Sequence, residues 1–155
     1  MLSFDIRSLT DHAVAVDDTL PATDPVWEDG DPLPSAPLRV KGRLSSAGPS
    51  RYYWHGSIEG EVALACSRCL GDAQAHVSTE AHLIFAEAGT EGVDDDPDVF
   101  LLDDRSSELD LRVAVREQWL LNVPGYALCR DDCQGLCPTC GAELNLGPCV
   151  HVVLG

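Results

Sequence analysis

Eight potential metal ligands occur in this chain as four short-spaced pairs. Seven are cysteines and one is a histidine, and the pairs are Cys66-x-x-Cys69, Cys129-x3-Cys133, Cys137-Pro-Thr-Cys140 and Cys149-Val-His151. Structural zinc takes four sulfur or nitrogen ligands from such pairs, because one turn presents two side chains to the same ion. The sequence therefore predicts two tetrahedral zinc sites that fix turns and loops of the fold.

Length and composition place the chain among single-domain proteins. It has 155 residues, 45% of them hydrophobic, which is enough to bury a core without disulfides. The odd cysteine count, and a charged N-terminus with no apolar signal segment, indicate a reducing cytoplasm. No run of about 18 apolar residues occurs, so we expect no membrane span. We expect one domain over 1–155, with a β-rich core and helix at 38–122 and a cysteine-rich zinc-binding tail at 129–151.

The chain is strongly acidic, with 26 acids against 10 bases and a formal net charge of −16. Such a field repels phosphate, so it disfavours broad binding to nucleic acid and favours a basic protein partner. Two stretches concentrate the acids: residues 11–31 carry seven acids and no Lys or Arg, and residues 87–110 carry ten acids and only Arg105. These stretches are either solvated loops and flexible connectors or a docking surface for a cationic partner.

Apolar and polar residues alternate in the middle of the chain. From Tyr52 to Leu64 and from Ala73 to Phe85 the period is two, which is typical of antiparallel strands with one wet face. The connection between them contains Cys66 and Cys69, so we expect the first cysteine pair in a hairpin turn. Residues 4–9 and 98–102 are expected to form further strands.

A strand is also predicted upstream, over residues 38–44. Three cations share one of its faces: Arg39, Lys41 and Arg43. They form either a solvated face that neutralises acids of the same chain or a local contact for RNA phosphate.

One helix is predicted over residues 109–122. Ser107, followed three residues later by Asp110, resembles a capping signal. Helical spacing places four apolar residues near the face expected to pack on the sheet: Leu109, Val113, Leu120 and Leu121. Arg112 and Arg116 would lie on or near the other side. The expected fold class is therefore α+β: an antiparallel sheet or partly open barrel, one packed helix and a zinc-ribbon-like tail.

Spacing alone leaves open how the four ligand pairs share two metals. In the first arrangement one metal is bound by Cys66, Cys69, Cys129 and Cys133, which ties the hairpin turn to the segment after the helix. The other metal is bound by Cys137, Cys140, Cys149 and His151. In the rival arrangement Cys129, Cys133, Cys137 and Cys140 bind one metal, and the other four ligands bind another. We favour the first arrangement, because the eight residues between Cys140 and Cys149 allow that loop to fold back.

The chemistry of these ligands favours a structural role. Four cysteines, or three cysteines and one histidine, leave no open position for water, whereas catalytic zinc keeps one. We therefore expect two structural zinc ions, no catalytic residue and no enzyme activity. One alternative is a thiol redox protein using Cys66 and Cys69, although a thioredoxin-like pair is expected at a helix N-terminus. Another is a zinc-stabilised protein-interaction module.

Several motifs together resemble a known family. They are Cys66-Ser-Arg-Cys69-Leu after a strand, Asp110-Leu111 through Arg116-Glu117, Pro124, and Cys129-x3-Cys133-Gln-Gly-Leu-Cys137-Pro-x-Cys140-Gly-x-x-Leu144-Asn145. Over residues 38–151 the chain resembles the YceD family of large ribosomal RNA subunit accumulation proteins. The final position of the tail is often cysteine in that family and is His151 here, which is also an acceptable zinc ligand.

The resemblance implies a cytoplasmic accessory factor of large-subunit biogenesis, needed for normal levels of 23S ribosomal RNA. Its acidic surface would hold a basic ribosomal protein or assembly factor, with at most a local contact to the RNA. Some family members lack the part corresponding to 137–151, which implies that the second metal site is self-contained and supports the first arrangement of ligands.

Overall fold

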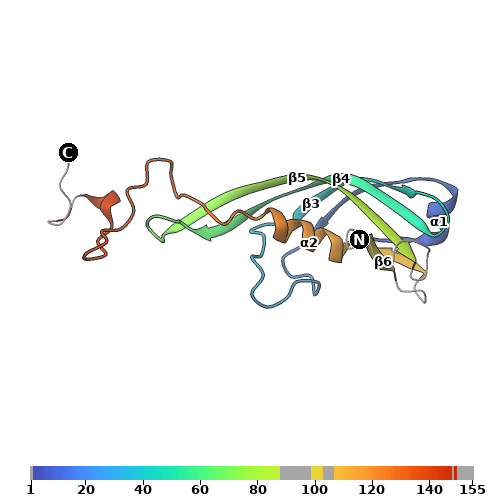
Figure 1. Cartoon of the computed structure of the whole chain (residues 1–155), viewed down its shortest axis with the longest axis horizontal. Coiled ribbons are helices and arrows are strands. Elements are labelled where there is room, and N and C mark those ends of the chain that lie inside the picture. Colours follow the sequence, from blue (N-terminus) through green and yellow to red (C-terminus); the bar gives the residue numbers. More distant parts are fainter. Residues whose placement is uncertain (1, 88–98, 103–106, 148, 150–155) are drawn as a thin grey trace.

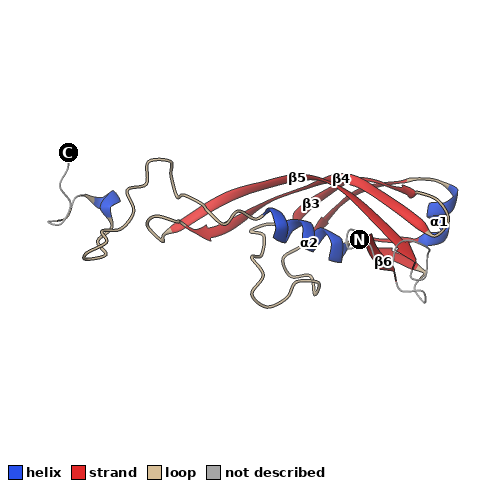
Figure 2. Cartoon of the chain, viewed as in Figure 1, coloured by secondary structure: helices blue, strands red, loops and turns tan. Residues whose placement is uncertain are grey.

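The computed structural model describes residues 2–87, 99–102, 107–147 and 149. Within them, an elongated five-stranded sheet carries helix α2 on one face (Figures 1 and 2). In spatial order its strands are β2 (Val14–Leu20), β3 (Leu38–Ser46), β4 (Arg51–Ala65), β5 (Asp72–Glu87) and β6 (Val99–Leu102). Neighbouring strands run antiparallel except β5 and β6, which are parallel. The predicted α+β class with one packed helix is confirmed, and the sheet is open.

The remaining elements are short. They are β1 (Ser3–Asp5), α1 (Ile6–Asp11), β7 (Glu108–Asp110), α2 (Arg112–Asn122) and the 3-10 turn η1 (Leu144–Leu146). β1 and β7 form a separate two-stranded antiparallel sheet, although about a hundred residues lie between them. Among the described residues, no helix is both long and apolar enough to span a membrane.

The period-two alternation correctly predicts the central hairpin. β4 and β5 pair from Arg51 opposite Ala86 to Ala65 opposite Asp72, and the buried side chains of each strand lie on one face, apart from Ala86. Residues 66–71 close this hairpin, so the first cysteine pair lies in a turn between strands, as expected. The strand predicted at 98–102 is also found over its described residues, 99–102.

The N-terminal segment differs from the prediction. Residues 4–9 do not form one strand, because β1 stops at Asp5 and α1 begins at the next residue. The Asp5 side chain caps this helix, with its Oδ1 accepting from the Arg7 N–H at 2.9 Å. A further strand, β2, lies within the acidic stretch 11–31 and was not predicted. Core residues therefore begin at Leu2, well before residue 38.

Helix α2 begins three residues later than predicted. Residues 108–110 pair with β1, so Leu109 is buried in a strand and Ser107 does not cap the helix. Leu111 occupies the N-cap position without a side-chain hydrogen bond there, while Asp110 accepts from the Arg112 N–H at 2.9 Å. Long-range strand pairing therefore overrides the local capping signal.

The predicted packing face of this helix is also wrong in part. Val113 and Leu121 are 50% and 77% exposed, whereas Val115 and Trp119 are fully buried. Leu111, Val115 and Trp119 follow one another at intervals of four residues, which places them on one side of a helix. This stripe packs on β4 and β5 and sets the orientation of α2 on the sheet.

Trp119 joins three parts of the fold. Its indole Nε1–H donates to the Pro32 carbonyl at 2.7 Å, and its ring packs over Gly60 of β4. A Cβ at Gly60 would lie 2.4 Å from Leu38 Cδ2 and 3.2 Å from the Trp119 ring, so only glycine allows this approach. The tryptophan thus connects α2, the sheet and the segment between β2 and β3.

The first acidic stretch is not a flexible connector. Arg116 binds Asp31 through two hydrogen bonds of 2.8 and 3.0 Å and Glu28 through one of 2.8 Å, and Arg112 contacts Asp24 at 3.1 Å. The segment between β2 and β3 is thereby fastened along the polar side of α2. Two arginines of the same chain offset part of the charge of these three carboxylates, so this part of the acidic stretch offers a partner less net charge than its sequence suggests. Most of the second stretch, 87–110, lies outside the described residues.

Stability is expected to depend on pH through Asp31. Its hydrogen bonds from Arg116, and that from the Glu28 N–H, lower the pKa of this carboxyl below its ordinary value of 3.8. The unfolded chain then takes up the proton first, so this contribution is complete above roughly pH 4 and is lost as pH falls through the lowered pKa. Asp31→Asn should lower the urea midpoint at pH 7 and reduce the loss of stability on acidification. The control is Asp29→Asn at an exposed position; equal midpoints for the two variants would contradict the prediction.

Candidate metal centres

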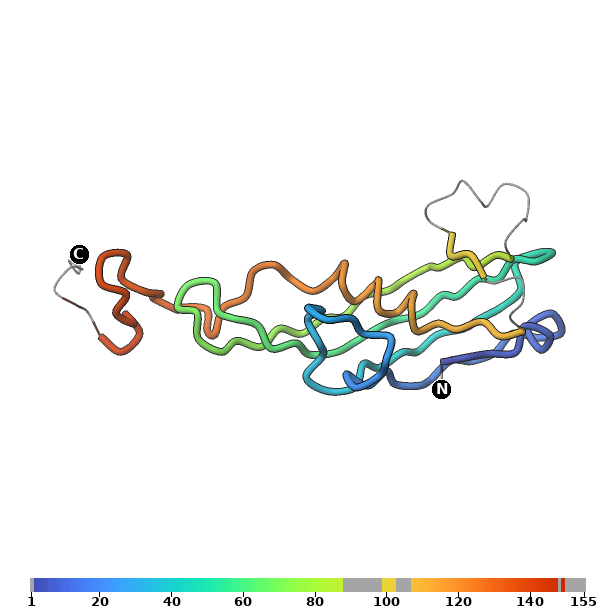
Figure 3. Tube along the Cα trace, turned by 90° about the horizontal axis from the view of Figure 1, so that it is seen from below, coloured from blue at the N-terminus to red at the C-terminus, as the bar shows by residue number. Residues whose placement is uncertain are grey.

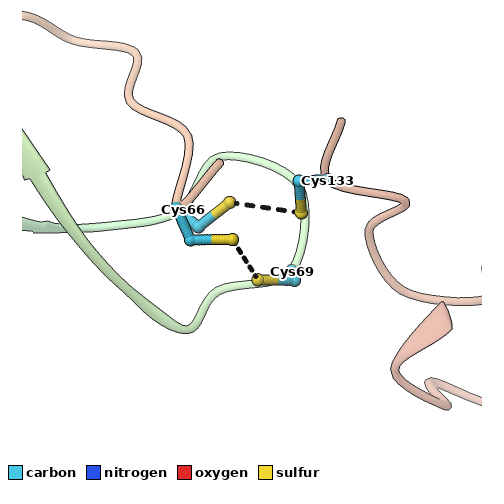
Figure 4. A group of neighbouring side chains, drawn as sticks. Cys66, Cys69 and Cys133 are labelled. Atoms are coloured by element: carbon cyan, nitrogen blue, oxygen red, sulfur yellow. Dashed lines mark hydrogen bonds between the residues drawn. The ribbon is translucent and has the colours of Figure 1, made fainter. Parts of the chain in front are cut away.

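The first four cysteines along the chain meet at one end of the sheet. The tip of the β4–β5 hairpin lies beside the segment that follows α2 (Figure 3). The sulfur atoms of the four cysteines all lie within 4.8 Å of one another. The group consists of Cys66, Cys69, Cys129 and Cys133, and is called the hairpin cluster below. Figure 4 shows three of these side chains converging on one point.

The spacing of these sulfurs suits a metal better than a disulfide. Cys66 Sγ lies 3.6 Å from Cys133 Sγ, and Cys69 Sγ lies 3.7 Å from Cys129 Sγ. A disulfide requires about 2.05 Å, whereas the sulfurs of a tetrahedral site with zinc–sulfur bonds of about 2.3 Å lie about 3.8 Å apart. All seven cysteines belong to the described residues, and none of them forms a disulfide. The hairpin cluster therefore fits one tetrahedral ion.

Backbone and side-chain contacts hold the two halves of this cluster together. The Ser67 N–H donates to the Ala127 carbonyl at 2.7 Å, and the Ala127 N–H donates back to the Ser67 Oγ at 3.1 Å. Arg68 adds a hydrogen bond of 2.9 Å from its Nη1 to the Cys133 carbonyl. The hairpin tip is thus docked on the segment after α2 by polar contacts that do not involve sulfur.

A second group of sulfurs lies in the C-terminal segment. Cys137, Cys140 and Cys149 also lie within 4.8 Å of one another and are called the tail cluster below. His151, predicted as the fourth ligand, lies outside the described residues. The sulfurs group as the first arrangement places them, and the rival grouping of 129, 133, 137 and 140 is not found.

The two Cys-x-x-Cys turns have the same backbone design. In the first, the Cys66 N–H donates to the Gly71 carbonyl and the Cys66 carbonyl accepts from the Leu70 N–H. The turn at Cys137 repeats both hydrogen bonds at the same sequence offsets. The residue after the second cysteine has positive φ in both turns, 65° at Leu70 and 75° at Gly141. Such a turn points backbone N–H groups at the first sulfur.

These N–H groups favour the thiolate form of the first cysteine in each turn. The Cys69 N–H contributes most to lowering the pKa of the Cys66 thiol to about 5, and the N–H groups of Cys140 and Thr139 lower that of Cys137 to about 6. Burial and the neighbouring sulfurs raise the pKa of Cys129 to about 12. Bound protons and a cation therefore compete for these sulfurs, as expected of metal ligands.

One contact at the hairpin cluster involves a residue to which the sequence assigned no role. Asn145 Nδ2 lies 3.3 Å from Cys133 Sγ, so a side chain of the tail segment reaches the hairpin cluster. The tail segment is thus connected to the hairpin cluster, although the sulfurs of its own cluster all come from residues 137–149. Asn145 belongs to the motif that resembles the YceD family, but its spacing from Cys133 gives no sign of a contact.

The predicted basic face lies on the exposed side of the sheet. Lys41 pairs in register with Asp17 of β2, and Arg39 pairs with Glu59 of β4. Cations and acids of the same chain are thus neighbours across strands, as expected for a solvated face that neutralises acids in cis. Arg43, the third cation, pairs in register with His55.

Comparisons with known proteins agree with the motifs. Residues 54–153 match the family described as large ribosomal RNA subunit accumulation protein YceD. Uncharacterised proteins of Mycobacterium bovis and of two strains of Mycobacterium tuberculosis are each 28% identical over 95 residues, covering 60% of this chain and 45% of theirs. The chain thus spans about half the length of the curated relatives it matches. No solved structure matches. Because the matched segment contains more than half of the chain and both cysteine clusters, this protein belongs to the YceD family.

Proposed function

We propose that this protein is a cytoplasmic, non-enzymatic accessory factor in the biogenesis of the large ribosomal subunit. The match over residues 54–153 carries the proposal, because the family is described by the accumulation of the large ribosomal RNA. The cysteine clusters support a structural role, since a closed shell of four ligands leaves no position for substrate or water.

Two structural zinc ions are part of the proposal. Cys66, Cys69, Cys129 and Cys133 would bind the first, and Cys137, Cys140, Cys149 and His151 would bind the second. The sulfur spacing of the hairpin cluster and the N–H groups aimed at the first cysteine of each turn support this assignment. Here zinc would cross-link separate parts of the chain and would not take part in a reaction. Protein purified under reducing conditions should contain close to two zinc ions per chain. Purified protein that contains no zinc would favour the alternative in which Cys66 and Cys69 act as a redox pair.

A basic ribosomal protein or assembly factor is the proposed partner. An apolar cavity of about 260 Å³ lies between β6 and α2, lined mainly by Phe85, Phe100, Leu102 and Val113, with Glu108 and Asp110 also in its wall. β6 is one of the two edge strands of the described sheet, and in sequence it lies within the stretch of ten acids and one base at 87–110. Apolar walls, an edge strand of the described sheet and the two carboxylates in the wall suit an extended segment that carries both apolar and cationic side chains.

Leu101→Lys should weaken this interaction. Leu101 is 50% exposed and contributes to the lining of the cavity, so the substitution places a cation where a cationic partner would bind. We expect at least about a tenfold loss of affinity for the purified basic partner, measured by titration at low salt. Glu80→Lys makes the more drastic charge change at an exposed position of β5 and is the control. A larger loss in the control would place the partner elsewhere.

Subunit profiles test the biological role. In a strain lacking the gene, sucrose gradients should show a deficit of large subunits, and expression of this chain should restore them. Normal subunit ratios would contradict the proposal. Capture experiments with ribosomal proteins and with fragments of ribosomal RNA, run side by side, identify the partner. Capture of RNA alone would replace the basic protein with an RNA contact at Arg39, Lys41 and Arg43.

A further inference from the structure

Asn145 lies between the two cysteine clusters and contacts one of them directly. Its Nδ2 donates to Cys133 Sγ at 3.3 Å, while its Oδ1 accepts from the Gln134 N–H at 2.9 Å and from Arg130 Nη2 at 2.7 Å. A further contact of 3.4 Å joins its Nδ2 to Glu143. Both ends of the amide are therefore used, and they hold the loop that carries Cys129 and Cys133.

The position of Asn145 is set by the tail. It occupies the middle of η1, immediately after the turn that contains Cys137 and Cys140. Leu136 forms an isolated β-bridge with Glu143, and the Leu144 N–H donates to the Gly135 carbonyl at 2.9 Å. The Cys137 N–H also donates to the Ala142 carbonyl at 2.9 Å. The Cys137–Cys140 turn and the turn that carries Asn145 therefore form one hydrogen-bonded unit.

The chemistry of the contact suits a thiolate ligand. An amide N–H that points at sulfur stabilises its negative charge and restricts its orientation, as outer-shell donors do at metal sites. Gly135 brings the loop close to the hairpin tip, because a Cβ there would lie 3.1 Å from the Arg68 carbonyl oxygen. Cys133 is thus held from the hairpin side by Arg68 and from the tail side by Asn145.

We propose that Asn145 is a positioning residue that couples the two metal sites. Zinc in the tail cluster orders the turn that carries Asn145, and Asn145 then holds the Cys133 thiolate in place for zinc in the hairpin cluster. Loss of zinc from the tail should therefore weaken zinc binding at the hairpin. The coupling rests on the proposed zinc sites but is a separate claim. The same eight ligands would serve equally well in two sites that bind zinc independently of each other.

Asn145→Asp tests the contact itself. The aspartate has the same shape and keeps an oxygen for Gln134 and Arg130, but it replaces the donor to Cys133 with a negatively charged oxygen. We expect affinity for the zinc of the hairpin cluster to fall by roughly 10- to 100-fold, measured in the full chain by competition with a chromogenic chelator. The matched control is Leu146→Ala, a neighbouring side chain that is 85% exposed, and it should leave both affinities unchanged.

A double-mutant cycle tests the coupling. Cys137→Ser combined with Cys140→Ser removes the tail site and leaves one zinc per chain, whose affinity then reports the hairpin cluster alone. If the sites are coupled, this zinc is held more weakly than the hairpin zinc of the unmodified chain, and adding Asn145→Asp has a smaller effect than it has in the unmodified chain.

The possible outcomes are distinct. Unchanged hairpin affinity after loss of the tail site, or equal effects of Asn145→Asp in both backgrounds, would overturn the coupling while leaving two zinc sites in place. Equal affinities for Asn145→Asp and Leu146→Ala would overturn the role of the Asn145 contact. Absence of zinc from the unmodified chain would overturn the zinc sites and the coupling together.

Discussion

Cys69→Ser is expected to lower the zinc content from two ions per chain to one and to release the hairpin tip from the segment after α2. Structural zinc contributes about 10–16 kcal/mol of apparent binding free energy in zinc-finger peptides, more than the few hydrogen bonds that also hold the tip. The sheet itself should persist, because its main core cluster includes none of the cysteines. The expected loss is therefore local to residues 66–71 and 125–147.

Two measurements check this expectation. Elemental analysis gives the zinc content, and limited proteolysis shows whether cleavage begins within 66–71 and 125–147. Ser78→Ala, at an exposed position of β5, is the control and should retain two zinc ions and the protection of both segments. A Cys69→Ser protein that keeps two ions and resists cleavage would show that the hairpin cluster does not bind structural metal.

Trp119→Ala is expected to cause the largest loss of stability among core substitutions in α2. The side chain is fully buried, and removing a buried tryptophan costs about 3–5 kcal/mol. The Pro32 carbonyl would also lose the indole N–H that contacts it at 2.7 Å. Because this residue joins the helix, the sheet and the acidic segment, we expect all three to lose order together.

Urea unfolding followed by circular dichroism measures this effect. Leu121→Ala is the control, since Leu121 belongs to the same helix but is 77% exposed; its effect should stay within about 0.5 kcal/mol. Similar midpoints for the two variants would mean that Trp119 is not a central contact of the core. Zinc content should be measured in both, so that loss of metal is not mistaken for loss of packing.

The sequence predicts those parts of the fold that depend on neighbouring residues. The alternation in β4 and β5 marks strands with one buried face, and the short cysteine spacings mark turns that present two sulfurs together. Together these two patterns correctly predict that Cys66 and Cys69 lie at a hairpin tip. Spacing by itself does not decide the grouping of the sulfurs, because Cys137 is closer along the chain to Cys133 than to Cys149; the fold decides it, by bringing Cys129 and Cys133 to the hairpin tip.

Long-range pairing accounts for the failures. Leu109 fits a helical pattern, but residues 108–110 pair with β1 near the other end of the chain, so α2 starts at Arg112. The acids of 11–31 suggest a solvated connector, yet Arg116 binds Asp31 from 85 positions away. Asn145 lacks a recognisable signal, since its contact with Cys133 depends on how the tail folds back. No local sequence pattern indicates any of these three contacts.

The separation between the two halves of the hairpin cluster also constrains the order of folding. Cys69 and Cys129 are 60 positions apart, and β5, β6, β7 and α2 lie between them. Closing a loop of that length in an unfolded chain has a large entropic cost, whereas a formed sheet and docked helix bring its ends together beforehand. Zinc capture at the hairpin should therefore be a late step, and a chain that has captured it has already completed its core. In a refolding experiment on a chain whose tail site has been removed by Cys137→Ser and Cys140→Ser, the signal for zinc binding at the hairpin should lag behind the signal for sheet formation.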